Sequence, residues 1–227
     1  MSVIPVCHHH EDSSDNEDID VPEFDSFIDV IAYYRKFISG EIQSCPTHGG
    51  PLDDETIPIV PQLLVLNKHN ILTVDSQPGS IDVIGDATIT DLHFGEIDVK
   101  KLEVIQRAYV DCYMDRSLCE DLSEELSGTE YIVFEEPYRA PTGETPTVTV
   151  PVTISKFMYG GETYNKVESA MPVAWGAPDM ICILNGTAVA KKNEIIRDIY
   201  SVRIMDTVWG RKTALFDTLV NFLEPTH

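Results

Sequence analysis

The sequence contains few basic residues: 16 Lys and Arg stand against 38 Asp and Glu, which gives a formal net charge of −22. A chain with this charge repels nucleic-acid phosphates and anionic lipid unless a dense basic patch compensates, and no such cluster of Lys or Arg occurs. No apolar run approaches the roughly 20 residues that a membrane-spanning helix needs. The first ten residues also lack the basic and apolar regions of a secretory signal. We therefore expect an intracellular protein with no direct nucleic-acid or membrane contact.

Cysteine is scarce too, and the five cysteines are odd in number and scattered. This is a poor disulfide framework, and it favours inert, buried thiols in a reducing compartment. A metal site is the alternative, built from Cys7, His8, His9, His10, Cys45 and His48. Zinc requires four ligands that converge in a closed geometry, and four of these six residues lie in the acidic N-terminal segment. We expect no metal.

Sequence motifs of common enzyme classes are missing. There is no P-loop, no Gly-x-Gly-x-x-Gly, no His-Glu-x-x-His and no Gly-x-Ser-x-Gly elbow. The sequence therefore identifies no catalytic residue and no cofactor, and it leaves open whether the protein is an enzyme.

The chain is long enough for one sizeable core. Residues 1–22 carry six acidic residues and no Lys or Arg, so we expect a disordered acidic tail. This tail serves either solubility or the binding of a basic protein partner. Residues 23–227 are expected to form a single domain of the α/β or α+β class, with a mixed β-sheet flanked by helices. A Pro/Thr-rich excursion is expected near residues 135–151.

Hydrophobic periodicity predicts the elements of this domain. Helices are expected at residues 24–39, 53–69 and 117–128, and strands at residues 71–74, 106–114, 131–134, 152–158, 163–167 and 199–205. A final amphipathic helix is expected from the spacing of Leu215, Phe216, Leu219, Phe222 and Leu223. Ser117 and Glu120 form a capping-box pattern at the third helix. The strand, helix and strand between residues 106 and 134 indicate an α/β unit. Residues 81–98 are interpreted as irregular or as two short strands.

Two polar turns, residues 75–79 and 206–211, each follow a predicted strand. If these strands are neighbours and run the same way, the turns meet at one edge of the sheet. The candidate ligand-binding residues are Asp75, Ser76, Gln77, Gly79, Arg107, Asp206, Trp209 and Arg211. The guanidinium of Arg211 can bind an anion, Trp209 can stack on a ring and Gln77 can bind a polar edge, so we expect a small polar or anionic ligand. The alternative is that these residues only stabilise the fold.

Three blocks of sequence carry a family resemblance. Residues 67–79 read Asn-Lys-His-Asn-Ile-Leu-Thr-Val-Asp-Ser-Gln-Pro-Gly, residues 106–108 read Gln-Arg-Ala, and residues 202–211 end in Asp-Thr-Val-Trp-Gly-Arg. With Glu55-Thr56, they resemble a family of small uncharacterised bacterial proteins, frequent in actinomycetes. Thr207 stands where that family has proline, and Asn70 where it has glycine. The acidic tail and the excursion are additions, which are consistent with an origin outside bacteria, such as a large DNA virus.

The resemblance implies a domain of unassigned function. Two hypotheses follow from the sequence. The first is a small-molecule-binding or catalytic domain whose polar pocket is built from the two turns. The second is an interaction or structural protein, for example a component of a virus particle.

Overall fold

The computed structural model describes residues 22–91, 95–138, 149–172, 180 and 183–225. The helices are α1 (Phe27–Ile38), the 3-10 helix η1 (Ile57–Ile59), α2 (Val60–Lys68), α3 (Arg116–Leu126), α5 (Val189–Ile195) and α6 (Ala214–Leu223). The strands are β1 (Leu72–Gln77), β2 (Ser80–Ile84), β3 (Ala87–Asp91), β4 (Gly95–Val99), β5 (Leu102–Gln106), β6 (Tyr109–Asp115), β7 (Tyr131–Pro137), β8 (Thr149–Tyr159), β9 (Glu162–Pro172) and β10 (Ile199–Asp206).

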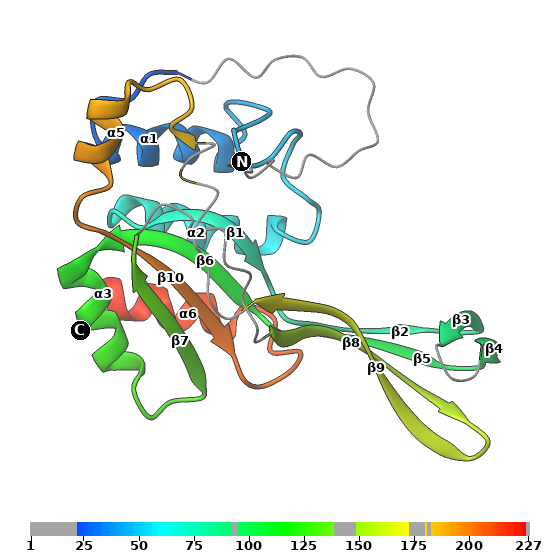
Figure 1. The fold of residues 1–227 in the computed structure, drawn as a ribbon. Coiled ribbons are helices and arrows are strands. Elements are labelled where there is room, and N and C mark those ends of the chain that lie inside the picture. Colours follow the sequence, from blue (N-terminus) through cyan, green and yellow to red (C-terminus); the bar gives the residue numbers. More distant parts are fainter. Residues whose placement is uncertain (1–21, 92–94, 139–148, 173–179, 181–182, 226–227) are drawn as a thin grey trace, which may run out of the picture.

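The body of the molecule is built on a four-stranded sheet with the order β1-β6-β10-β7 (Figure 1). Every strand pair among the described residues is antiparallel, so the fold belongs to the α+β member of the two predicted classes. The expectation of mixed strand directions was wrong. The hydrophobic core includes buried side chains from this sheet and from helices α1, α2, α3 and α6.

The strand order explains how the predicted α/β unit is realised. Strand β10 lies between β6 and β7 and is antiparallel to both, so β6 and β7 run in the same direction and α3 connects them. In the same way β1 and β10 lie on either side of β6 and run the same way. The turns after β1 and β10 therefore leave the sheet at the same edge. The assumption that these two strands are neighbours was wrong, because β6 lies between them.

Local chemistry fixes the helix ends. The side chain of Ser26 accepts a hydrogen bond from the backbone N–H of Asp29 at 3.2 Å and caps α1, whose apolar stripe is buried. Helix α3 is capped by Asp115, whose carboxylate accepts from the N–H of Leu118 at 2.9 Å. The capping box predicted at Ser117 was therefore wrong by two residues, because the preceding strand already ends in an aspartate that can cap.

A second sheet forms an arm that projects from the body (Figure 1). Its strand order is β2-β5-β8-β9, and the hairpin β3-β4 packs against it through a small apolar cluster. Strands β8 and β9 are joined at Gly160 and Gly161, both with positive φ, as the predicted hairpin requires. Residues 81–98, interpreted as irregular or as short strands, contribute β2, β3 and β4.

Parts of two predictions fall outside the described residues. The acidic tail does so except for residue 22. The ends of the predicted excursion belong to β7 and β8, and its residues 139–148 are not described. Among the residues that the structure describes, no helix combines the length and the hydrophobicity that a membrane crossing demands.

Candidate functional site

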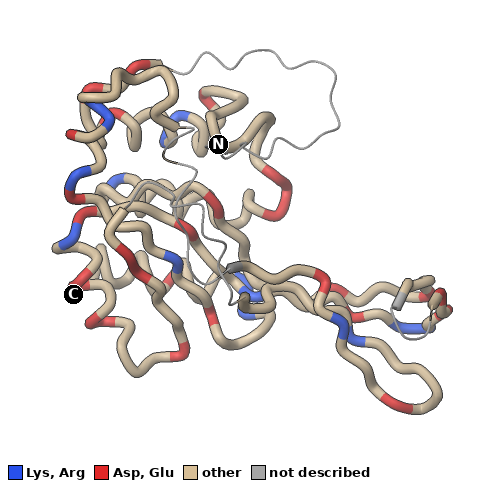
Figure 2. The backbone as a smooth tube through the Cα atoms, in the orientation of Figure 1, with Lys and Arg blue, Asp and Glu red and all other residues tan. Residues whose placement is uncertain are grey.

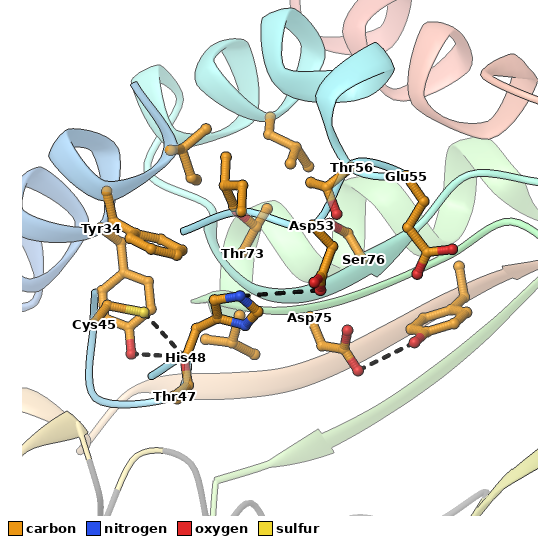
Figure 3. Close-up of a pocket in the computed structure, with 16 residues that line it drawn as sticks. Tyr34, Cys45, Thr47, His48, Asp53, Glu55, Thr56, Thr73, Asp75 and Ser76 are labelled. Carbon is orange, nitrogen blue, oxygen red and sulfur yellow. Dashed lines mark hydrogen bonds and ion pairs between the residues drawn. The ribbon is translucent and has the colours of Figure 1, made fainter. Parts of the chain in front are cut away.

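A pocket lies over β1, between this strand, α1 and the loop that precedes α2 (Figure 3). Its cavity volume is about 90 Å³. Apolar and aromatic side chains line its interior, including Tyr34, Phe37 and Leu63, and three acidic side chains line it as well, Asp53, Glu55 and Asp75. None of the described residues that line it is a Lys or an Arg. The pocket is therefore a hollow with an acidic, largely polar lining and with aromatic and aliphatic side chains in its walls.

Strand β1 is the edge of its sheet and carries a bulge at Val74. The pairing register shifts between Thr73, which lies opposite Cys112, and Asp75, which lies opposite Asp111. A bulge turns neighbouring side chains away from the regular alternation and often occurs beside functional sites. Here it lets consecutive residues from Thr73 to Ser76 all line the pocket.

The opposite wall is the loop of residues 45–56. Cys45 and His48 form an isolated antiparallel bridge with two backbone hydrogen bonds of 2.9 Å. The Nε2 of His48 lies 2.8 Å from the carbonyl oxygen of Pro51 and 3.9 Å from a carboxylate oxygen of Asp53. These contacts fold the loop back over β1, and Asp53 and Glu55 of the loop line the same pocket as Asp75 (Figure 3).

Asp75 has a perturbed carboxyl group. The residue keeps part of its surface exposed to solvent, but the protein around the carboxyl group displaces much of its hydrating water. This desolvation raises the pKa of Asp75 above its ordinary value. The hydroxyl of Tyr109 donates to it at 3.2 Å, and this bond and the charge of Arg203 oppose the rise in the pKa. Burial also raises the pKa of Tyr109. Tyr109 therefore stays a protonated donor.

We expect Asp75→Asn to stabilise the protein at neutral pH. A raised pKa means that the folded state holds the Asp75 proton more tightly than the unfolded state does. The stability contributed by Asp75 is then present at low pH and is lost as the pH rises from the ordinary aspartate pKa through the raised pKa of the folded protein. The asparagine variant should have the higher melting temperature at about pH 7, and this advantage should shrink toward about pH 4. An advantage that grows toward low pH would contradict the assignment.

The structure divides the eight predicted ligand-binding residues into two groups. Asp75 and Ser76 line the pocket. The other six lie where the turns after β1 and β10 meet the start of β6, and they are Gln77, Gly79, Arg107, Asp206, Trp209 and Arg211. The turns are joined directly, because the N–H of Gly79 donates to the carbonyl of Lys212 at 2.9 Å. The predicted meeting of the two turns is therefore present.

We call the place where the turns after β1 and β10 meet the start of β6 the junction. Its polar side chains bind one another. The guanidinium of Arg211 donates to both oxygens of Asp206, at 2.7 and 2.5 Å, and also to Glu130. The carboxylate of Asp206 is fully buried. The guanidinium of Arg107 stacks on the ring of Trp209, 4.2 Å from its centroid. Since the fork of Arg211 is occupied by carboxylates of the protein, we propose the pocket over β1, rather than this junction, as the ligand site.

Sequence reasoning missed several residues of the pocket. His48 was considered only in the alternative metal set. Asp53, Glu55 and Thr56 were placed at the start of the helix predicted at residues 53–69, and Glu55 and Thr56 also belonged to the family resemblance. The Glu55-Thr56 pair of the family resemblance is the sequence signal that could have pointed to this loop, because both residues line the pocket together with Asp53.

The described residues do not support the alternative hypothesis of a metal site. No group of three or more potential ligand side chains occurs there. The thiol of Cys45 lies 3.5 Å from the hydroxyl of Thr47, and burial raises the pKa of this thiol, which disfavours the thiolate that a metal needs. Cys7, His8, His9 and His10 lie outside the described residues.

Comparisons with known proteins assign most of the chain to a protein family. Residues 26–226 match the model of a family described as a domain of unknown function, DUF6919. Methylenetetrahydrofolate reductase 2 of Saccharomyces cerevisiae is similar to part of it: 27% of 110 residues are identical, which is 48% of this chain and 17% of the yeast protein. The chain thus spans about a sixth of the length of this curated relative. The expected bacterial distribution and viral origin stay predictions.

Proposed function

The chain belongs to the DUF6919 family, and we propose that it is a small-molecule-binding domain whose pocket over β1 takes a small organic cation. The observation that carries the proposal is the charge of the lining. Three carboxylates face one hollow, and no Lys or Arg of the described lining offsets them. A cationic group would neutralise charge that is now only partly solvated.

The aromatic lining supports the same class of ligand. The rings of Tyr34 and Tyr109 belong to the pocket together with Phe37. Aromatic faces attract alkylated cations, and apolar walls favour the carbon atoms that such cations carry. Because an inorganic cation would gain little from these walls, an alkylammonium or guanidinium group fits the pocket better.

The size of the cavity limits what it can enclose. A volume of about 90 Å³ corresponds to roughly three water molecules of liquid volume. Whole ligands of ordinary size occupy pockets of about 300 Å³ or more. The pocket therefore encloses a head group, and the rest of a larger ligand would extend past Asp53 and Glu55 into solvent, since both side chains are exposed.

Binding of tetramethylammonium and ethylguanidinium tests the proposal. We expect both cations to raise the melting temperature in a saturable manner, and acetate to have no such effect. Glu55→Gln and Asp75→Asn should each weaken binding about tenfold, which is the loss of about 1.4 kcal/mol of charge attraction. Isothermal titration of the full chain measures both constants.

The adjacent Asp54→Asn is the matched control, because Asp54 is exposed and does not line the pocket. It removes the same charge from the same loop and should leave the affinity unchanged. Equal losses in all three variants would show only a general effect of net charge. No binding by the parent protein would refute the cation proposal.

The name of the yeast relative suggests a second ligand to test, a folate. Folates carry carboxylates, and the acidic lining would repel them. The reductase activity is that of the yeast protein, of which this chain covers 17%. We therefore expect no thermal shift with methylenetetrahydrofolate, and a clear shift would favour the folate over the cation.

A further inference from the structure

The guanidinium of Arg107 has no carboxylate partner within the part of the chain that the structure describes. Its Nη1 donates to the sulfur of Met205 at 3.9 Å, and a thioether is a weak acceptor. Its Nε is buried and has no hydrogen-bond partner among the described residues. Buried polar groups nearly always have partners in folded proteins. Arg107 therefore presents N–H donors that the described chain leaves unfilled, in contrast to Arg211.

Asp206 attracts Arg107 but does not pair with it. Both carboxylate oxygens of Asp206 accept hydrogen bonds from Arg211, and one of them also accepts the N–H of Val208 at 2.8 Å. Burial lowers the pKa of Arg107, and the charge of Asp206 opposes this shift only in part. The positive charge of Arg107 is thus incompletely compensated, and an added anion would stabilise it.

Backbone hydrogen bonds hold Arg107 beside Trp209. The N–H of Gly210 donates to the carbonyl of Gln106 at 2.9 Å, which fixes the turn that carries Trp209 next to Arg107. The N–H of Arg107 donates to the carbonyl of Val152, also at 2.9 Å. The guanidinium carbon lies 4.2 Å from the centroid of the Trp209 ring. A pair that is already in place loses little conformational freedom when a ligand binds.

A carboxylate attached to a flat ring is the ligand chemistry that fits this pair. The planar guanidinium can donate parallel hydrogen bonds to a carboxylate. A charge pair that is open to water contributes little by itself, so the rest of the ligand must add contacts. Arg107 and Trp209 are both partly exposed, and aromatic rings stack on indole and on guanidinium groups. A doubly charged phosphate would instead be repelled by the acidic residues spread over the body (Figure 2).

We propose that Arg107 and Trp209 bind an aromatic carboxylate, with its carboxylate on the guanidinium and its ring against the indole. Arg107 follows the last residue of β5 in the arm and precedes β6 of the body. The ligand would therefore bind where the arm joins the body (Figure 1). Neither residue lines the pocket over β1, so this second site is independent of the proposed cation site.

Isothermal titration of the full chain with benzoate, at constant ionic strength, tests the proposal. We expect saturable binding and a higher melting temperature in the presence of benzoate. Acetate has the carboxylate without the ring, and benzamide has the ring without the charge. Each should bind at least about tenfold more weakly than benzoate. Acetate that binds as tightly as benzoate would contradict the role of the ring, and benzamide that does so would contradict the role of the charge.

Arg107→Gln should weaken benzoate binding at least about tenfold. It should change the melting temperature of the ligand-free chain by no more than about 3 °C, because the guanidinium has no strong partner to lose. Arg107→Lys keeps the charge but not the planar fork. It should also weaken benzoate binding, and it provides a second test if the glutamine variant fails to fold. Benzoate binding that both variants retain would overturn the proposal.

Arg116→Gln is the matched control. Arg116 also lies over an aromatic ring, 5.5 Å from the centroid of Tyr200, but it is exposed at the start of α3, beyond the opposite end of β6. The variant loses the same charge and should bind benzoate as the parent protein does. Equal losses in Arg107→Gln and Arg116→Gln would show a general effect of charge and overturn the proposal. So would the absence of benzoate binding by the parent protein.

Discussion

Replacing Arg211 with alanine is expected to lower the free energy of unfolding by about 3 kcal/mol. The change removes both hydrogen bonds from the guanidinium and leaves the fully buried carboxylate of Asp206 with a hydrogen bond from the N–H of Val208 at 2.8 Å. Breaking a buried ion pair from one side costs about 3–5 kcal/mol, because a charge stays behind without compensation. The lower end applies here, since the Arg211 side chain is 27% exposed and water can replace part of it. Urea denaturation measures the loss.

Two further variants identify the cause. Asp206→Asn combined with Arg211→Ala should be less destabilised than Arg211→Ala alone, because the stranded charge is removed as well. Lys68→Ala breaks a pair of 2.6 Å between exposed partners, Lys68 and Glu224, and should cost under about 1 kcal/mol. If Arg211→Ala were as stable as the parent, the guanidinium would be available for a ligand, and the junction would return as a candidate site.

Gly79→Ala is expected to cost about 1–3 kcal/mol, the usual range for overpacking. A Cβ at this position would lie 2.9 Å from the backbone nitrogen of Arg211 and 3.1 Å from that of Lys212. Neither backbone atom can rotate away as a flexible side chain would. The turns after β1 and β10 must separate, which also stretches the hydrogen bond from Gly79 to the carbonyl of Lys212.

Gly85→Ala is the control for this effect. A Cβ at Gly85 meets nothing within 4 Å, so its effect should stay within about 0.5 kcal/mol. Thermal unfolding of both variants separates a clash at the junction from a general loss of backbone freedom. Equal melting temperatures for the two variants would mean that the two turns are not held as closely as the structure shows.

The two polar turns, residues 75–79 and 206–211, show how much of the candidate site the sequence could predict. The first strand was predicted from a short apolar run and the second from alternation, and the turns were predicted to meet if the strands are neighbours and run the same way. The strands do run the same way, but they are not neighbours, because β6 lies between them. The expected anion site at Arg211 depended on a free guanidinium. Sequence could not show that Asp206, five residues earlier, holds it with two hydrogen bonds.

Local patterns in the sequence determined the amphipathic helices α1 and α6, the β8-β9 hairpin with its two glycines, the strand β10 and the acidic character of the chain. These features depend on neighbours a few residues apart, so periodicity and turn chemistry are sufficient to predict them. Only the tertiary structure decided that β10 lies between β6 and β7, that Glu55 lines the same hollow as Asp75, and that the β3-β4 hairpin packs on the sheet of the arm. The physical reason is that strand order and loop placement depend on packing between segments far apart in the chain, which no local pattern records.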